Sequence, residues 1–260
     1  MIQPLSYVHP TAKIAEGVVI DPFVTIHGDV EIGEGSHIMS GATIFKGSRI
    51  GKGVRVFPGA SIGAIPQDLK FDGEDSLTII GDNSTVREYV TINRGTKALG
   101  YTKVGKNVLL MAYVHLAHDC VVGDNCILAN SVQVAGHVTI GDWAILGGAA
   151  LVHQFVKVGQ HSMISGGSLV RKDVPPYTKA AREPLSYEGV NSIGLRRRNF
   201  NDEKIREIQD IYRTLFVKGH NASKAMKTIE TEFAPTPERD EILQFIRESD
   251  RGIMKGYLAK

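Results

Sequence analysis

The sequence predicts a mainly β protein: a parallel β-helix of hexapeptide repeats followed by a small C-terminal α-helical domain. Three observations predict it. An aliphatic residue returns at every sixth position through most of the chain, a small residue occupies a second fixed slot in each hexapeptide, and both patterns stop before a segment with helical spacing. A period of six does not close on a helical face, whereas repeats of fixed length are typical of solenoids.

The aliphatic slot keeps one register from Val8 to Val170. Every sixth residue in that register is Ile, Leu or Val, except at Asp68, Glu74 and Ala98. Two residues before nearly every aliphatic stands Ala, Ser, Thr, Val or Cys. Side chains two residues apart in a strand face the same way. Each hexapeptide is therefore expected to be a short strand with one small and one large inward side chain, followed by a corner.

Two segments, 66–78 and 94–103, interrupt the pattern and preserve its phase. Both are polar, contain Gly and carry charges, so they are expected to loop out of the prism, and loops on a rigid scaffold often hold functional residues. From Asn201 onward, a polar cap and apolar residues at helical spacing predict three helices. The expected domains are a β-helix over 1–184 and a helical domain over 185–260.

The repeat is similar to that of the hexapeptide-repeat proteins. This resemblance implies a left-handed parallel β-helix in which three hexapeptides form one triangular coil, so that each residue stacks on the residue eighteen positions further on. The flat faces of such solenoids commonly bury against one another in closed symmetric assemblies. A homotrimer is therefore expected.

Composition argues against several other classes of protein. With 42% hydrophobic residues, 22% charged residues and a net charge of +2, the chain can bury a core, and its charge does not imply nucleic-acid binding. Two cysteines are too few for a disulfide framework. The start of the chain lacks the basic and apolar regions of a signal peptide, and no apolar run approaches the roughly 20 residues of a membrane helix. A cytoplasmic protein without a membrane span is expected.

The segment "MAYVHLAHDC" concentrates groups that suit metal binding or acid–base chemistry. His115, His118, Asp119 and Cys120 are all possible zinc ligands. The repeat register assigns Cys120, and likewise Cys126, to an inward core slot. It leaves His115 on the outer face and His118 at a corner. The histidines are therefore expected to be exposed functional groups, whereas Cys120 is not expected to contact a ligand.

Stacking by eighteen residues predicts a column beside this corner. Gly136 lies one coil after His118 and Gln154 one coil after Gly136, with His137 and His153 next to them. A single histidine is usually a solvated surface residue, but four of the nine histidines converge on this one edge. The column therefore indicates a functional site rich in imidazole groups.

The segments "QDLKFDG", "VHLAHDC", "VQVAGHV", "VHQF" and "GVNSIGLRRRNF" occur in this order, and with them the chain resembles the UDP-N-acetylglucosamine 3-O-acyltransferase family over nearly its whole length. The resemblance implies transfer of an (R)-3-hydroxyacyl chain from acyl carrier protein to the 3-hydroxyl of the sugar of UDP-N-acetylglucosamine, the first step of lipid A biosynthesis. It implies no metal and no cofactor, because the acyl donor is carried on the phosphopantetheine of acyl carrier protein.

The resemblance also assigns roles to residues. His118 is the expected general base, since a sugar hydroxyl is a poor nucleophile and an imidazole with a pKa of about 6.5 suits proton abstraction. Asp119 is expected to orient it, and the Gly136 N–H to stabilise the oxyanion of the tetrahedral intermediate. Gly166 is expected to leave the acyl groove open for long chains. The expected substrate-binding residues are Gln67, Asp68, Lys70, His115, His137, His153, Gln154, Asn191, Arg197 and Arg198.

Other functions stay open on the residues alone. A related N-acyltransferase or a coenzyme-A-dependent acetyltransferase would share the repeat and the histidines. A zinc-dependent trimeric carbonic anhydrase would use histidines such as His115 and His118, although the helical tail with its arginine run has no purpose in a hydratase. A non-catalytic β-helical scaffold would not need the imidazole-rich column.

Overall fold

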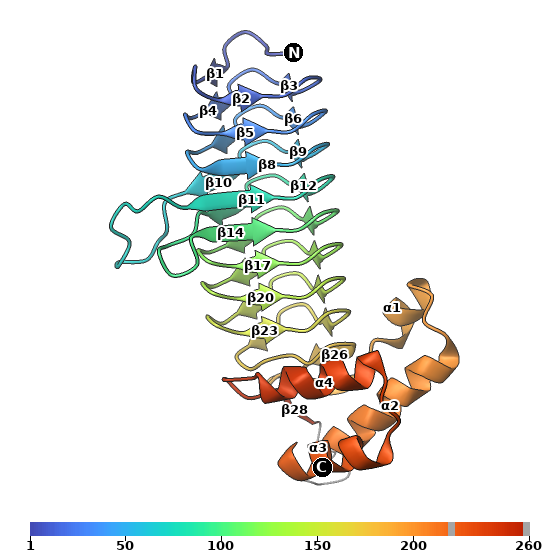
Figure 1. Ribbon diagram of the computed structural model, residues 1–260. Helices are drawn as coiled ribbons and strands as arrows, with labels where there is room; N and C mark the ends of the chain where they lie inside the picture. The colour runs from blue at the N-terminus through green and yellow to red at the C-terminus, as the bar shows by residue number, and fades with distance from the viewer. Residues whose placement is uncertain (218–221, 257–260) are drawn as a thin grey trace.

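The chain folds as a triangular prism of short parallel strands with a small group of helices at its C-terminal end (Figure 1). This computed structural model describes residues 1–217 and 222–256. Residues 218–221 and 257–260 of the expected helical domain lie outside the described residues. Along most of the prism each strand pairs with its third successor, so three strands complete one coil.

Three sheets form the faces of the prism. The first sheet has nine strands: β1 (Tyr7–Val8), β4 (Thr25–Ile26), β7 (Thr43–Ile44), β10 (Ser61–Ala64), β13 (Thr91–Asn93), β16 (His115–Leu116), β19 (Gln133–Val134), β22 (Leu151–Val152) and β25 (Leu169–Val170). The second has eight: β2 (Lys13–Ile14), β5 (Glu31–Ile32), β8 (Ser48–Ile50), β11 (Leu77–Ile80), β14 (Tyr101–Val104), β17 (Val121–Val122), β20 (Thr139–Ile140) and β23 (Lys157–Val158). The third has eleven: β3 (Val19–Ile20), β6 (His37–Ile38), β9 (Arg55–Val56), β12 (Thr85–Val86), β15 (Leu109–Leu110), β18 (Ile127–Leu128), β21 (Ile145–Leu146), β24 (Met163–Ile164), β26 (Thr178–Ala181), β27 (Ser186–Val190) and β28 (Lys255–Gly256).

Successive coils stack in register. Val134 pairs with Leu116 on one side and with Val152 on the other, eighteen residues away in each direction. The inward aliphatic and small side chains of all three sheets form one continuous core. Cys120 and Cys126 are fully buried in it, and burial raises the pKa of each thiol to about 12. The expectation that both cysteines are core residues is confirmed.

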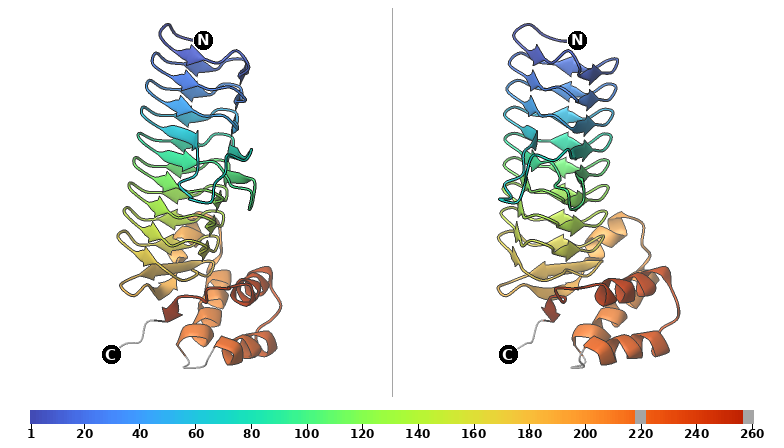
Figure 2. Two further views of the ribbon diagram at one scale, coloured as in Figure 1. Left: turned by 90° about the vertical axis from the view of Figure 1, so that its left-hand side faces the viewer. Right: turned by 60° about the vertical axis from the view of Figure 1, so that its left-hand side comes forward.

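The two interrupting segments project from the side of the prism, beside β11 and β14 (Figures 1 and 2). They are shorter than expected. The loop expected at 66–78 ends at residue 76, and the loop expected at 94–103 ends at residue 100. From Leu77 and Tyr101 onward the two segments pair with each other as β11 and β14, because backbone hydrogen bonding continues the sheet. We call residues 65–76 the first loop and residues 94–100 the second loop.

The C-terminal part contains the helices α1 (Ser192–Arg197), α2 (Asp202–Phe216), α3 (Ala222–Glu232) and α4 (Pro237–Arg247). The Asn201 side chain caps α2 by accepting a hydrogen bond from the Lys204 N–H at 2.8 Å. The three expected helices are confirmed, and α1 was not expected. β27 and β28 lie beyond residue 184 and still extend the third sheet. No helix of the described part of the chain is long and apolar enough to cross a membrane.

Candidate active site

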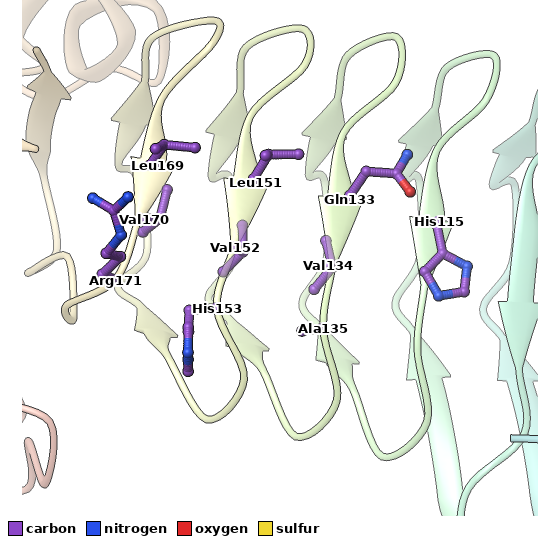
Figure 3. Close-up of a pocket in the computed structure, with 10 residues that line it drawn as sticks. All are labelled: His115, Gln133, Val134, Ala135, Leu151, Val152, His153, Leu169, Val170 and Arg171. Atoms are coloured by element: carbon purple, nitrogen blue, oxygen red, sulfur yellow. The ribbon is translucent and has the colours of Figure 1, made fainter. Parts of the chain in front are cut away.

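A groove of about 380 Å³ lies on the outer surface of the first sheet, towards the C-terminal end of the prism (Figure 3). Its lining comes from β16, β19, β22 and β25, whose equivalent side chains point the same way because the coils stack in register. His115 lies at one end and Arg171 at the other, with Gln133, Leu151 and Leu169 between them. The groove therefore offers apolar walls with polar groups at both ends.

Two of the expected substrate-binding histidines line this groove. His115 Nδ1 lies 2.7 Å from Thr91 Oγ1, and burial lowers the pKa of His115, which keeps the ring neutral at neutral pH. His153 is exposed, and its Nδ1 lies 3.1 Å from the carbonyl oxygen of Gln154. The Gln154 side chain is half-buried and is not part of the groove lining.

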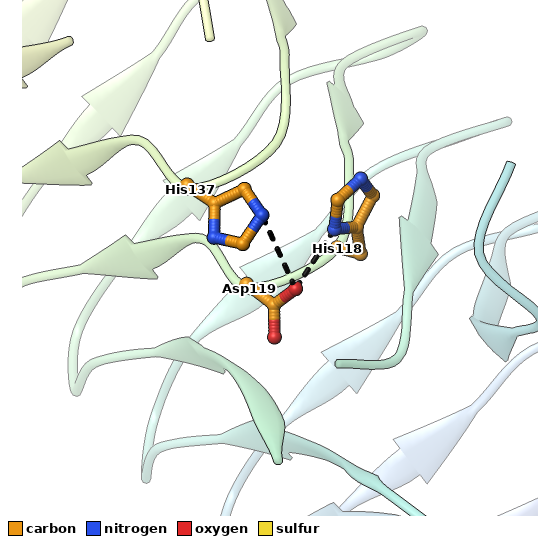
Figure 4. A group of neighbouring side chains, drawn as sticks. All are labelled: His118, Asp119 and His137. Carbon is orange, nitrogen blue, oxygen red and sulfur yellow. Dashed lines mark hydrogen bonds and ion pairs between the residues drawn. The ribbon is translucent and has the colours of Figure 1, made fainter. Parts of the chain in front are cut away.

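His118 and Asp119 form a hydrogen-bonded pair at the corner between β16 and β17 (Figure 4). His118 Nδ1 lies 2.8 Å from Asp119 Oδ2. Because the carboxylate accepts, Nδ1 carries the proton and Nε2 keeps its lone pair for abstracting another. The expectation that His118 is exposed is wrong, since the residue is only 7% exposed. The next coil packs against its ring and covers this corner.

The Asp119 carboxylate is buried and accepts several hydrogen bonds. Thr96 donates to it twice, from its N–H at 2.9 Å and from its hydroxyl at 2.7 Å. Burial alone would raise the pKa of Asp119, but the hydrogen bonds from His118 and Thr96 outweigh it and lower the pKa. The carboxylate is therefore ionised at neutral pH. Thr96 is absent from the expected site residues, and only its place in an expected loop hints at a role.

Gly136 packs directly on the His118 ring from the next coil, as stacking by eighteen residues predicts. A Cβ atom at this position would lie 2.7 Å from His118 Cε1 and Nε2. A glycine is therefore required for this close approach. Among the hydrogen bonds of the described residues, none is donated by the Gly136 N–H. The group is available to an oxyanion beside His118.

His137 completes the corner. Its ring stands perpendicular to that of His118 with centroids 5.0 Å apart, and its Nε2 lies 3.7 Å from Asp119 Oδ2 (Figure 4). His118, Asp119 and His137 each offer one ligand atom within 4.8 Å of the others, a set that could hold zinc. The 2.8 Å separation between His118 and Asp119 is that of a hydrogen bond, however. His115, the other histidine of the carbonic-anhydrase alternative, lies in the groove and outside this set.

The expected ligands Gln67, Asp68 and Lys70 lie together on the first loop. Gln67 and Lys70 are exposed, and the Asp68 carboxylate accepts a hydrogen bond from the Lys70 N–H at 3.0 Å. Within one chain, no hydrogen bond or ion pair of the described residues joins these three to His118 or Asp119.

A second cavity, of about 350 Å³, lies between the third sheet and α1. Asn191 and Arg197 line it, together with Lys179, which the sequence analysis did not single out. Asn191 is buried and caps α1: its side chain accepts from the Gly194 N–H at 3.3 Å and donates to the His161 carbonyl at 2.9 Å. Arg197 is exposed, so its guanidinium is open to an anion.

Arg198 points elsewhere. Its guanidinium lies 3.3 Å from His161 Nδ1 and 5.1 Å from the centre of the Trp143 ring. His161 is stacked between Trp143 and Tyr177, and burial together with the charge of Arg198 lowers its pKa to about 4. A neutral imidazole can accept from a guanidinium, so this aromatic stack holds Arg198 in place. Neither Trp143 nor His161 was expected from the sequence to support the site.

Gly166 lies at the exposed corner between β24 and β25. A Cβ atom there would approach the Gly148 carbonyl oxygen to 3.0 Å. Gly166 lines neither the groove nor the second cavity of a single chain.

Comparisons with known proteins agree with this architecture. Residues 173–254 match the family described as UDP N-acetylglucosamine O-acyltransferase, domain 2, and residues 1–46 and 101–136 match the bacterial transferase hexapeptide family. An acyl-[acyl-carrier-protein]–UDP-N-acetylglucosamine O-acyltransferase from Trichlorobacter lovleyi is 52% identical over 98% of this chain and 99% of its own length.

Solved structures are similar over nearly the whole chain. The crystal structure of a UDP-N-acetylglucosamine acyltransferase from Bacteroides fragilis matches with a TM-score of 0.97 and 53% identity, covering 98% of this chain and 100% of the other. The Francisella novicida UDP-N-acetylglucosamine acyltransferase matches with a TM-score of 0.95 and 40% identity, over 98% and 94% of the two chains. The expected fold class, a left-handed parallel β-helix with a C-terminal helical domain, is confirmed.

Proposed function

The chain belongs to the UDP-N-acetylglucosamine O-acyltransferase family, and from this membership we propose that His118 and Asp119 form the catalytic pair of its acyl transfer. The reaction is transfer of an (R)-3-hydroxyacyl chain from acyl carrier protein to the 3-hydroxyl of UDP-N-acetylglucosamine, the first step of lipid A biosynthesis. The observation that carries the assignment is the buried hydrogen bond from His118 to an ionised Asp119, with Gly136 packed on the same imidazole.

The pair supplies general base catalysis. His118 Nε2 takes the proton of the sugar hydroxyl while its oxygen attacks the thioester carbonyl carbon. Asp119 holds the ring orientation and stabilises the imidazolium that forms. The Gly136 N–H donates to the oxyanion of the tetrahedral intermediate. When the intermediate collapses, the carbon–sulfur bond breaks and the leaving thiolate of phosphopantetheine receives the proton from His118.

The substrates are assigned to the cavities by their chemistry. The groove with Leu151 and Leu169 suits an acyl chain, and His115 at its end and His153 in its lining suit the sugar and the pantetheine arm. Arg197, which opens into the second cavity, suits the diphosphate, because guanidinium groups form charge-assisted hydrogen bonds to phosphate oxygens. Arg198 lies outside that cavity and is assigned to the diphosphate by the family resemblance. The remaining expected ligands, which are part of this proposal, are Gln67, Asp68, Lys70, His137, Gln154 and Asn191.

These subsites support a homotrimer. The groove lies on the first sheet, whereas the cavity of Arg197 lies on the third, so one chain does not bring the diphosphate site and the base together. A neighbouring copy that packs its face against the groove would complete each site. The third sheet carries outward apolar side chains on successive strands that suit such a contact: Leu109, Ile127, Ile145 and Met163. Sedimentation at the assay concentration tests this assembly. A protein that sediments as a monomer and has full activity at that concentration would contradict it.

The proposal includes no metal and no cofactor beyond the acyl carrier. It also includes a cytoplasmic location. Cys120 and Cys126 are both free thiols, as is usual for proteins of a reducing compartment.

The test is acyl transfer by the purified protein. We expect mass spectrometry to detect the 3-O-acyl product from UDP-N-acetylglucosamine and (R)-3-hydroxyacyl acyl carrier protein, without loss of activity in chelator. His118→Ala should lower kcat by about 10²- to 10⁴-fold, the usual contribution of a general base. His37→Ala is the matched control, since His37 also pairs with a carboxylate, that of Asp21 at 3.0 Å, far from the site. Its kcat should be that of the wild type.

Three results would overturn the proposal. A normal kcat in His118→Ala would show that His118 is not the general base. Faster acylation of the 3-amino analogue of the sugar nucleotide would favour the N-acyltransferase. Stoichiometric zinc with chelator-sensitive hydration of carbon dioxide would favour the carbonic anhydrase.

A further inference from the structure

One carboxylate fixes the second loop, residues 94–100, to the candidate active site. Asp119 Oδ1 accepts hydrogen bonds from the N–H groups of Thr96 at 2.9 Å and Leu99 at 3.3 Å. Asp119 Oδ2 accepts the Thr96 hydroxyl at 2.7 Å and His118 Nδ1 at 2.8 Å. The same oxygen atom therefore joins the loop to the imidazole.

The direction of the Thr96 hydroxyl is set by its own partners. The Ala98 N–H donates to Thr96 Oγ1 at 3.2 Å, so the hydroxyl proton is left to point at Asp119 Oδ2. Thr96 is 6% exposed and Asp119 is 3% exposed. With so little access to water, the hydrogen bonds from protein groups decide how the carboxylate is rotated.

The second loop is also held at Gly95, the residue that precedes Thr96. A Cβ atom on Gly95 would lie 2.3 Å from the Tyr101 nitrogen, so the backbone of residue 95 packs directly on β14. The Ser76 hydroxyl donates to the Gly95 carbonyl at 2.6 Å, and this bond ties the second loop to the end of the first. Thr96 therefore stands on a fixed backbone and presents its hydroxyl from a defined position.

We propose that Thr96 is a positioning residue of the acyl transfer: its hydroxyl fixes the rotation of the Asp119 carboxylate and thereby the tautomer and orientation of the His118 ring. The proposal rests on the proposed role of His118 as the general base. Thr96 touches no reacting atom in this arrangement. Its loss should therefore act on proton transfer, which depends on the ring orientation, and leave the binding of the sugar nucleotide unchanged.

The test compares Thr96→Val, which keeps the shape and removes the hydroxyl, with Thr96→Ser, which keeps the hydroxyl. We expect kcat of Thr96→Val to fall by about 10- to 100-fold, the factor that corresponds to one charge-assisted hydrogen bond. The KM for UDP-N-acetylglucosamine should not change, and Thr96→Ser should recover most of kcat. Thr214→Val is the matched control, because Thr214 is fully buried in α2, away from the site, with its hydroxyl bonded to the Asp210 carbonyl.

Thr96→Val with the thermal stability and the kcat of the wild type would overturn the proposal, and so would a change confined to KM. If Thr96→Val does not fold, Thr96→Ala removes the hydroxyl together with the methyl group and places no apolar group against the Asp119 carboxylate. A kcat of Thr96→Ala equal to that of Thr96→Ser would then overturn it. His118→Ala, measured in parallel, separates the two hypotheses. A normal kcat in His118→Ala would refute the role of His118 as the general base. A normal kcat in Thr96→Val together with an inactive His118→Ala would refute only the positioning role of Thr96.

Discussion

Gly136 stands so close to His118 that a Cβ atom on the glycine would lie 2.7 Å from the Cε1 and Nε2 atoms of the imidazole. The two residues belong to neighbouring coils, and the contact places the backbone of Gly136 beside Nε2 of His118, the nitrogen proposed to act as the base. A methyl group at residue 136 must displace the ring from Asp119. It would also fill the space where an oxyanion would meet the Gly136 N–H.

Gly136→Ala should therefore lower kcat by about 100-fold or more, because the substitution would disturb both the proposed oxyanion donor and the proposed base. Steady-state kinetics beside thermal denaturation would show whether the loss is catalytic. Gly28→Ala is the matched control, because a Cβ at this glycine would meet the side chains of Thr11 and His9, in the N-terminal coils. Equal kcat in Gly136→Ala and the wild type would show that the His118 ring accommodates the added methyl group without loss of function.

Arg197→Ala and Arg198→Ala should each raise KM for the UDP-sugar about 10- to 100-fold with little change in kcat, because a charge-assisted hydrogen bond to phosphate contributes about 1.5–3 kcal/mol. Arg196→Ala is the control within the same arginine run. Arg196 is paired with Asp202 at 2.9 Å, and its loss should leave KM unchanged. Initial-rate measurements over a range of UDP-N-acetylglucosamine concentrations give the KM of each variant. An unchanged KM in both Arg197→Ala and Arg198→Ala would show that these arginines are solvated surface residues and do not bind the diphosphate.

Gly166→Met should shift the preferred donor from long chains, of about fourteen carbons or more by family resemblance, to chains several carbons shorter. Gly166 lies outside the groove of a single chain, so this prediction rests on the family resemblance, which places the end of the acyl chain beside residue 166. Each buried CH₂ contributes about 0.8 kcal/mol, so a side chain that occupies the volume of the terminal methylenes removes the advantage of the longest donors. Gly166→Ala should give a smaller shift. Competition between donors of different length measures the preference, and an unmoved preference would place the limit on chain length elsewhere.

Acid should weaken the fold through His161. Its pKa is lowered to about 4 in the folded protein by burial and by Arg198, from an ordinary value of about 6.5. Between these two values the unfolded chain binds a proton that the folded chain does not, so stability is lost as the pH falls below 6.5. The loss between pH 7 and pH 5 should be about 2 kcal/mol from this residue.

Calorimetric Tm values at the two pH values test this in wild type and in His161→Phe, which keeps a ring for the stack and cannot be protonated. The fall in Tm on acidification should be smaller in the variant. The same fall in both proteins would assign the acid sensitivity to other groups.

The sequence by itself determined the coil and which side chains fill it. The alternation of side chains along a strand has a period of two and the repeat a period of six, so the register alone sends Cys120 and Cys126 inward. Together with the stacking by eighteen residues that the resemblance to hexapeptide-repeat proteins implies, it also places Gly136 against His118. These are local rules applied many times, and the hydrophobic core enforces them at every turn of the prism.

Only the tertiary structure decided how the corner that holds His118 and Asp119 is enclosed. His118 is buried, although its position in the repeat is a corner, and the Thr96 hydroxyl reaches Asp119 from an inserted loop whose path the repeat does not set. Arg197 and Arg198 are neighbours in sequence, yet one opens into a cavity and the other is held by His161. Contacts of this kind depend on how segments outside the repeat close over it, and no local periodicity carries that information.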